Sequence, residues 1–462
     1  MNTIENAVQE FHNNNLDNAE KIALEILNEN ASSREAIDVL AAIYLKIEKL
    51  DLLENEIPNK LAIVRQIAMF LEDLQMFPQS IVFYQKALEL DPTDSVAYNN
   101  LGLIYEQIEE IDNAKEAYEK SLEIKNNYPA AYNLGVLHRK LKNLQESEKY
   151  LIKAIMLKPT NPYANYSLGM TYLMGKQFGK GYPYFICRPI FGKENFKNIW
   201  DGKKYPDKKL LVFCEYGLGD AVMFSRYLPY LKEYFKDVVV CCPSSLIPLF
   251  QNSFPEIKFV NTIVNLEYDY STFIMDLPYR LKMKFDNIPS KDEYLKVDEQ
   301  KVNEYKQKYF NNDKLKVGIF YVGGELEKRN AQYRAIELKQ LEKLFTLNNC
   351  EFYSFQKDDP FEELKDFPEI IDLGKTFKDF TDTAAAMKNI DVMVTIDSVP
   401  VHLAGALGIR TLLMLPKYSE WRWFTDTETT PWYNSVELTQ QTTACDWQTV
   451  VDEIYNKLSN LG

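Results

Sequence analysis

The spacing of apolar residues predicts two kinds of architecture along the chain. Up to about residue 180, apolar side chains recur at helical spacing in segments that short polar breaks separate. From Lys208 onward, short β-branched and aromatic runs alternate with helical patterns, which is typical of parallel sheets with crossover helices. We therefore expect a helical region at 1–180, followed by two α/β halves at 181–295 and 296–462.

Internal repetition sharpens the prediction for the helical region. The segment Asn100–Tyr105 returns as Asn133–His138 and as Ser167–Tyr172, and the glycines within the three copies lie 33 and then 34 residues apart. Small residues recur at two positions of each second helix, namely Ser80, Ala114 and Ser147, and Ala87, Ser121 and Ala154. This period, with Pro92 and Pro159 closing two of the units, resembles the tetratricopeptide repeat.

Stacked repeats of this kind bury their apolar faces against one another and form a superhelix with a concave groove. The groove predicts a docking surface for a partner protein or peptide. The alternatives are a spacer and a dimerisation arm, which would make the protein a homo-oligomer.

The first α/β half opens with an apolar run at Leu210–Phe213 that leads into Gly217-Leu218-Gly219-Asp220 and a helical pattern. Gly217 and Gly219 permit a sharp turn and a close approach of another molecule. Asp220 would lie at a helix start on the carboxyl edge of a sheet, where ligand sites form. The alternative is that Asp220 only caps the helix.

In the second half, a buried strand is predicted to end at Asp397-Ser398, and Pro400 suits the first turn of the next helix. Ser398 and the free N–H groups at that helix start are well placed for a phosphate. His402 lies one turn further and would face the same site; the alternative is a buried core histidine. A final amphipathic helix at 447–458 would pack back across the cleft between the halves.

A glycine-rich basic loop is predicted after Phe320. It carries Gly323-Gly324 followed by Lys328, Arg329 and Arg334, and these fixed cations suit a diphosphate. The alternative is a solvated basic loop. The segment Lys357–Pro360 after the next strand is either a ligand contact or a plain turn.

Composition excludes several classes of function. The 53 Lys and Arg against 67 Asp and Glu give a net charge of −14, which argues against a nucleic-acid partner. Three histidines and six cysteines show neither metal-site nor disulfide spacing, so we expect no metal, reduced thiols and a cytoplasmic location. We see neither a signal peptide nor a run of the roughly 20 apolar residues that a membrane span needs.

Three of these motifs, in order, resemble the lipopolysaccharide heptosyltransferases and related glycosyltransferases of the GT-B fold: Gly217–Asp220, Arg329–Arg334 and Asp397–Gly408. The resemblance covers about 200–462. The segments Trp421-Arg422-Trp423 and Pro431-Trp432-Tyr433 look more like the branch in which this module is fused to tetratricopeptide repeats. The resemblance implies two Rossmann-like halves, a nucleotide-sugar donor, and no metal or other cofactor.

The resemblance also implies roles for single residues. Asp220 would be the general base on the acceptor hydroxyl, and Gly217 and Gly219 would belong to the acceptor loop. Donor binding would fall to Asp397, Ser398 and His402 with Arg329, while Arg334 would neutralise leaving-group charge. Val399-Pro400 and Ala335–Glu337 depart from the family pattern and leave the donor open.

The resulting hypothesis is a cytoplasmic, metal-independent glycosyltransferase whose repeat region docks a protein acceptor, such as a flagellar or surface protein. Two alternatives stay open: a repeat-based scaffold with an inactive, ligand-binding transferase module, and a transferase acting on a lipopolysaccharide-type glycan. The sequence leaves the base, the sugar, the acceptor and the stereochemical outcome unassigned.

Overall fold

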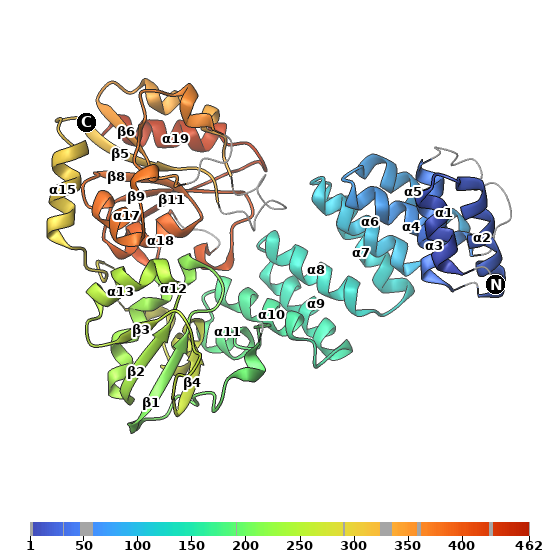
Figure 1. Ribbon diagram of the computed structural model, residues 1–462, viewed down its shortest axis with the longest axis horizontal. Helices are drawn as coiled ribbons and strands as arrows, with labels where there is room; N and C mark the ends of the chain where they lie inside the picture. The colour runs from blue at the N-terminus through green and yellow to red at the C-terminus, as the bar shows by residue number, and fades with distance from the viewer. Residues whose placement is uncertain are drawn as a thin grey trace. The chain divides into compact units, whose positions relative to one another are not determined.

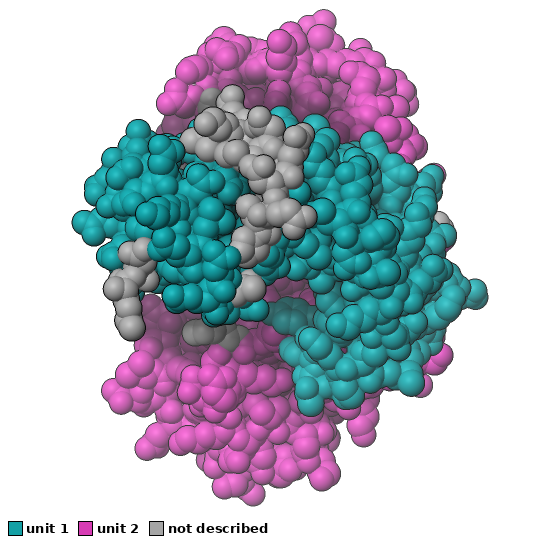
Figure 2. Space-filling view, turned by 90° about the vertical axis from the view of Figure 1, so that its right-hand side faces the viewer, with its two compact units in different colours: residues 1–139, 145–164 teal, residues 140–144, 165–462 magenta. Residues whose placement is uncertain are grey.

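The computed structural model describes residues 3–30, 32–46, 59–190, 192–289, 292–323, 335–357, 362–424 and 428–461. The chain divides into two compact units (Figure 2). The first unit comprises Met1–Arg139 and Gln145–Ala164, and the second comprises Lys140–Leu144 and Asn165–Gly462. Among the described residues, the first unit contains helices and the second contains both β-sheets (Figure 1).

The helical region consists of consecutive helices, which short turns join from α4 onward. Its helices are α1 Ile4–His12, α2 Leu16–Glu29, α3 Arg34–Lys46, α4 Lys60–Asp73, α5 Phe77–Leu90, α6 Ser95–Gln107, α7 Ile111–Ile124, α8 Tyr128–Lys140, α9 Leu144–Leu157, α10 Pro162–Met174 and α11 Phe178–Phe185. The predicted helix ends before Pro92 and Pro159 are confirmed, because α5 ends at Leu90 and α9 at Leu157.

The repeated small residues lie where paired helices cross. All six side chains at the two repeated positions are fully buried. The Ser80 hydroxyl donates to the carbonyl of Ala68, and the Ser147 hydroxyl donates to the carbonyl of Gly135, each at 2.7 Å. A Cβ on Gly102 would lie 2.5 Å from the ring of Tyr118, so only glycine allows this approach. The repeat period therefore marks helix contacts.

We predict that Gly169→Ala destabilises the second unit while Gly179→Ala does not. A Cβ at 169 would lie 2.5 Å from the backbone nitrogen of Phe185, so α10 and α11 must separate at a cost of about 1–3 kcal/mol. Gly179, also helical, has no atom within 4 Å, and alanine there gains up to about 1 kcal/mol in helix propensity.

Urea unfolding followed by tryptophan fluorescence measures this difference. All five tryptophans lie between Trp200 and Trp447, so the signal reports on the second unit alone. Equal effects of the two substitutions would show that the close approach at Gly169 is not maintained in solution.

The first α/β half is a four-stranded parallel sheet with strand order β3-β2-β1-β4. Its elements are β1 Tyr205–Phe213, α12 Leu218–Phe224, β2 Phe235–Cys241, α13 Ile247–Ser253, β3 Lys258–Val260, β4 Tyr270–Phe273 and α14 Leu277–Arg280. A long 3-10 helix, η3 (Ser225–Glu233), extends α12. The strand predicted at Leu210–Phe213 is present as the second part of β1.

The second α/β half is a seven-stranded sheet with order β10-β11-β9-β8-β5-β6-β7, in which only the β10–β11 pair is antiparallel. Its elements are α15 Glu299–Tyr309, β5 Leu315–Phe320, β6 Cys350–Ser354, β7 Ile371–Asp372, α17 Phe380–Met387, β8 Val392–Ile396, α18 Val399–Ala406, β9 Thr411–Leu415, β10 Thr429–Thr430, β11 Tyr433–Gln440 and α19 Gln448–Ser459. The sequence did not predict β7, β10 or β11. The α/β class predicted for this region is confirmed.

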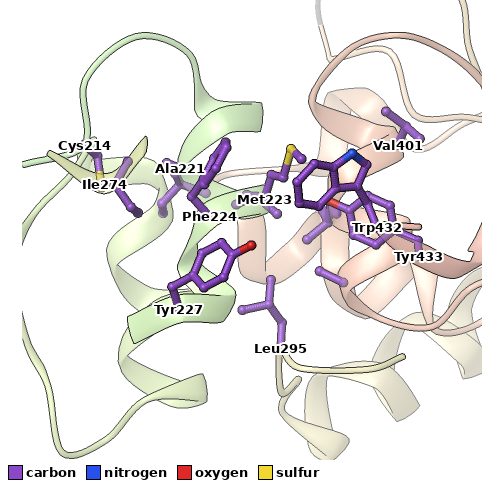
Figure 3. Close-up of a cluster of buried hydrophobic side chains, with 14 of the residues drawn as sticks. Cys214, Ala221, Met223, Phe224, Tyr227, Ile274, Leu295, Val401, Trp432 and Tyr433 are labelled. Carbon is purple, nitrogen blue, oxygen red and sulfur yellow. The ribbon is translucent and has the colours of Figure 1, made fainter. Parts of the chain in front are cut away.

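The two halves meet through a shared apolar core. Helix α12 of the first half packs against α18 of the second. Met223 and Phe224 of α12 belong to the same buried cluster as Trp432 and Tyr433, and Figure 3 shows Met223 beside Trp432. This packing brings the carboxyl ends of β1 and β8 to a common region, because α12 follows β1 and α18 follows β8.

Two predicted features differ from the structure. Helix α19 does not cross to the first half: Val450, Val451 and Ile454 lie in a cluster with the β5, β8 and β9 side chains of its own sheet. The sequence placed a boundary at residue 180, whereas the second unit begins at Asn165 apart from the short segment 140–144. Phe178, Tyr182 and Phe185 of α11 lie in the core of the second unit.

Candidate functional site

Asp220 lies in the first turn of α12, directly after the loop that follows β1. Its Oδ2 accepts a hydrogen bond from the N–H of Gly217 at 3.4 Å, so the carboxylate does cap the helix. The left-handed residue of the loop is Tyr216, with a φ of 66°, and not a glycine as the sequence suggested. The Tyr216 hydroxyl donates to the carbonyl of Pro189, which holds the turn.

The second oxygen of Asp220 binds an arginine from the other half. Arg422 lies in the 3-10 helix η11 (Trp421–Trp423), and its Nη2 donates to Asp220 Oδ1 at 3.0 Å. Glu420 Oε2 lies 3.4 Å from the same nitrogen. The side chains of Asp220 and Arg422 are 14% and 12% exposed, so this is a largely buried ion pair. Asp220 thus has a partner that the sequence did not predict.

Gly219 lies where the two halves approach each other closely. A Cβ on Gly219 would lie 2.8 Å from Cδ2 of His402 and 3.5 Å from Cα of Val399. The close approach predicted for this glycine therefore serves the chain itself, because it seats α12 directly on the first turn of α18.

His402 is buried between the two halves and uses both ring nitrogens within the protein. It is 1% exposed and stacks on Trp423, with ring centroids 5.7 Å apart and an interplanar angle of 14°. Nε2 lies 3.3 Å from Arg422 Nη1, and Nδ1 lies 3.0 Å from the hydroxyl of Tyr433. Because a guanidinium only donates, Nε2 is the acceptor, and Nδ1 carries the ring proton.

The environment of His402 keeps the imidazole neutral. Burial lowers its pKa well below the ordinary value, and the positive charges of Arg422 and Arg226 lower that pKa further. A charged imidazole would place a second cation against Arg422. The contact between His402 and a ligand stays a prediction. In this structure Nε2 of His402 is already bound by Arg422.

We predict that His402 stays neutral, with Nδ1 protonated, when the pH is lowered through 6.5. Two-bond 1H–15N NMR of histidine-labelled protein reports this directly, since the chain has only three histidines. The unfolded chain binds a proton at this position near pH 6.5 and the folded chain does not. The free energy of unfolding therefore falls by about 1.4 kcal/mol per pH unit below 6.5 for this residue. Titration of His402 near pH 6.5 would contradict its burial.

Asp397 and Ser398 lie where the sequence placed them, at the end of β8 and the start of α18. Asp397 is buried, and its charge contributes to the raised pKa of Arg422. Ser398 is the N-cap residue of α18, yet its side chain makes no capping hydrogen bond. The predicted Asp220, Asp397 and His402 thus gather around one guanidinium.

The remaining predicted donor residues cannot be placed. Gly324, Lys328, Arg329 and Arg334 lie outside the described residues, as do the residues at 358–360. Gly323 ends the described part of the loop after β5, and Lys357 is exposed.

Arginines within apolar surroundings are the functional candidates that the sequence analysis missed. Arg226 is fully buried, donates to the Trp432 carbonyl at 2.7 Å, and lies 4.6 Å from the Tyr433 ring centroid. It ties η3 of the first half to the loop before β11. Arg422, flanked by two tryptophans, was noted only for its likeness to a family segment. A charged residue within an apolar run is seldom buried without a partner. An arginine in such a run therefore predicts a buried ion pair or hydrogen bond, and this signal could have pointed to Arg422.

A second buried ionic cluster includes Glu215, which lies in the loop between β1 and α12 that leads to Asp220. Arg188 donates to Asp276 Oδ1 at 2.6 Å and to Glu215 Oε1, and all three residues are at most 4% exposed. Glu215 also accepts from the backbone N–H of Ile274 at 3.0 Å. Burial lowers the pKa of Arg188, but the two carboxylates raise it more, so the guanidinium stays charged. The loop between β1 and α12 is therefore anchored to the end of β4.

The chemistry of the site is that of paired charges. Within the described ranges, no group of three or more His, Cys, Asp or Glu side chains is arranged to hold a metal ion. Among the helices of the described residues, none has the length and apolar character needed to span a membrane. What the site offers is a carboxylate with an arginine partner, beside a helix N-terminus.

Comparison with known proteins identifies the repeats. Models of the tetratricopeptide repeat match residues 83–116 and 128–161, so these segments are tetratricopeptide repeats, as predicted. A curated relative, "Protein FlbA" of Caulobacter vibrioides (strain ATCC 19089 / CIP 103742 / CB 15), is 25% identical over 427 residues. That match covers 82% of this chain and 69% of the relative.

Solved structures similar to the chain align with about a third of it. The MamA protein is 22% identical over 36% of this chain and 88% of its own, with a TM-score of 0.30. YrrB, described as a TPR protein with an unusual peptide-binding site, is 27% identical over 31% of this chain and 71% of its own, with a TM-score of 0.26.

Proposed function

We propose that the protein is a glycosyltransferase of the GT-B type that transfers a sugar from a nucleotide-sugar donor to an acceptor hydroxyl. The observation that carries the proposal is the meeting of Asp220, from the carboxyl end of β1, with Arg422 and His402 of the second half. In an open α/β sheet, ligands bind at the carboxyl ends of the strands, and here two such ends come together.

Each group has a role in this reaction. Asp220 accepts the proton of the acceptor hydroxyl, since glycosyl transfer requires an activated nucleophile. The positive end of the α18 dipole, with the Ser398 hydroxyl, which makes no capping hydrogen bond, faces the donor's diphosphate. No metal is required, because arginine and helix N–H groups can balance the charge of the leaving phosphate.

The acceptor is proposed to be a protein held by the tetratricopeptide repeats. The first helices of two successive repeats, α6 and α8, are linked by Asn133, which donates to Asn99 at 3.0 Å. Tyr132 stacks on Tyr128 at 5.6 Å, and Tyr163 is 53% exposed. Amide and tyrosine side chains on neighbouring repeats suit an extended peptide, because they bind its backbone without demanding one sequence.

Thermal unfolding with a panel of nucleotide sugars tests the donor half of the proposal. We expect one of the UDP, GDP, ADP, CDP or TDP sugars to raise the unfolding temperature of the second unit. A ligand at 100 times its Kd adds about 2.7 kcal/mol of stability, which corresponds to a rise of about 4 °C. Asp220→Ala should show the same rise in unfolding temperature, because in this proposal Asp220 acts on the acceptor and does not hold the donor. Absence of a shift with every donor would rule the proposal out.

A further inference from the structure

The guanidinium of Arg422 is held in place from several sides. Its backbone carbonyl accepts from the indole N–H of Trp432 at 2.8 Å, and Trp421 and Trp423 on either side are buried. Nη1 is directed at the neutral ring of His402 and Nη2 at Asp220. Nε is buried and has no hydrogen-bond partner among the described residues. Arg422 is therefore fixed in direction and keeps an unused donor.

Carboxylates surround this cation. Asp220 lies 3.0 Å and Glu420 3.4 Å from Nη2, and Asp397 acts on the guanidinium electrostatically. Burial lowers the pKa of Arg422, but Asp220 and the other two carboxylates raise it more, so the residue stays charged. While Asp220 is ionised, its charge balances that of Arg422.

We propose that Arg422 is a switchable cation, paired with Asp220 before sugar transfer and released toward the donor's departing diphosphate when Asp220 takes up the acceptor's proton. This inference rests on the proposed function.

The step balances in atoms and charge. The acceptor O–H bond breaks and its proton goes to Asp220, while the acceptor oxygen forms a bond to the anomeric carbon. The bond from that carbon to the phosphate oxygen breaks, and its electron pair leaves with the nucleoside diphosphate. One negative charge disappears from Asp220 and one appears on the phosphate, so Arg422 changes partner without moving a proton itself.

His402 acts here as a positioning residue. Its Nε2 accepts a hydrogen bond from Nη1 of Arg422, and its Nδ1–H donates a hydrogen bond to the hydroxyl of Tyr433. Gly219 packs closely against the His402 ring, and Trp423 stacks on it with ring centroids 5.7 Å apart. The guanidinium can therefore exchange its partner at Nη2 while it stays bound at Nη1.

The Asp220→Asn variant mimics the protonated state of Asp220 and provides the test. Its affinity for the product can be measured by isothermal titration with ADP, CDP, GDP, UDP, TDP and inorganic pyrophosphate on the full chain. We expect the diphosphate that binds wild type to bind Asp220→Asn about tenfold more tightly, because the guanidinium, no longer paired with an opposite charge at position 220, makes a charge-assisted contact with the ligand. Adding Arg422→Met to Asp220→Asn should abolish the gain.

Matched controls come from the partly exposed ion pair of Arg410, directly before β9, and Glu437 of β11, whose charged atoms lie 2.8 Å apart. Glu437→Gln and Arg410→Met make the same charge changes and should leave diphosphate affinity unchanged. If the ion pair between Asp220 and Arg422 were purely structural, weakening it would not increase the affinity for the diphosphate. A gain in affinity therefore distinguishes a switchable cation from a structural ion pair.

The outcomes are distinct. Equal affinity of wild type and Asp220→Asn, or a gain that persists in the double variant, would overturn the switch and leave glycosyl transfer standing. No binding of any diphosphate or pyrophosphate to any variant would overturn the proposed function and this inference with it. Should the double variant fail to fold, the comparison of wild type with Asp220→Asn decides alone.

Discussion

Asp220→Asn is expected to lower kcat for sugar transfer by about 10²–10⁴-fold, which is the usual contribution of a general base. The physical reason is that asparagine keeps the size of Asp220 and can still accept a hydrogen bond from Arg422, but cannot take the acceptor's proton. An assay that detects the released nucleoside diphosphate measures the rate, whether the sugar goes to an acceptor or to water.

The control for this prediction is Glu437→Gln, which removes one carboxylate charge from a partly exposed ion pair away from Asp220. Its rate should stay at the wild-type value. KM for the donor should not rise in Asp220→Asn, because the loss lies in the chemical step. A rate within about threefold of wild type would show that another group deprotonates the acceptor.

Arg188→Met is expected to lower the free energy of unfolding of the second unit by about 3–5 kcal/mol. The substitution leaves Glu215, which is 4% exposed, buried without a cation. Asp276 keeps only the more distant Arg280, whose Nη2 lies 3.8 Å from its Oδ2. Urea unfolding followed by tryptophan fluorescence measures the change in the second unit.

Two comparisons make this prediction specific. Arg410→Met breaks an ion pair with a 43% exposed arginine and should cost at most about 1 kcal/mol. Adding Glu215→Gln and Asp276→Asn to Arg188→Met should recover part of the loss, because fewer charges remain buried without a partner. A cost below about 1 kcal/mol for Arg188→Met alone would mean that water reaches the cluster.

The features predicted correctly from sequence are those that depend on local spacing. The repeated glycines mark helix crossings, as Gly102 against Tyr118 shows, because a fixed period places the same contact in each repeat. The strands at Leu210–Phe213 and Val392–Ile396 were recognisable since buried parallel strands read as continuous apolar runs. Strand β11 was missed because polar residues interrupt its pattern.

The partners within the site could not be predicted in the same way. Arg422 reaches Asp220 across 202 positions of sequence, and no local pattern records such a pair. The turn before Asp220 was assigned to its glycines, yet the strained residue is Tyr216, held by a contact with Pro189 of the preceding connector. These long-range contacts of the Gly217–Asp220 motif became known only from the structure. The placement of Arg329 and Arg334 stays a prediction.

Helix α11 sets a limit on how this protein can be recombined with others. Its residues Phe178, Tyr182 and Phe185 serve as core residues of the unit that contains both sheets. A chimaera that exchanged the repeat array at residue 180 would divide this helix and expose a tryptophan-rich core. A junction in the turn before Pro162 keeps α10 and α11 with the sheets, so foreign repeat arrays should be grafted there.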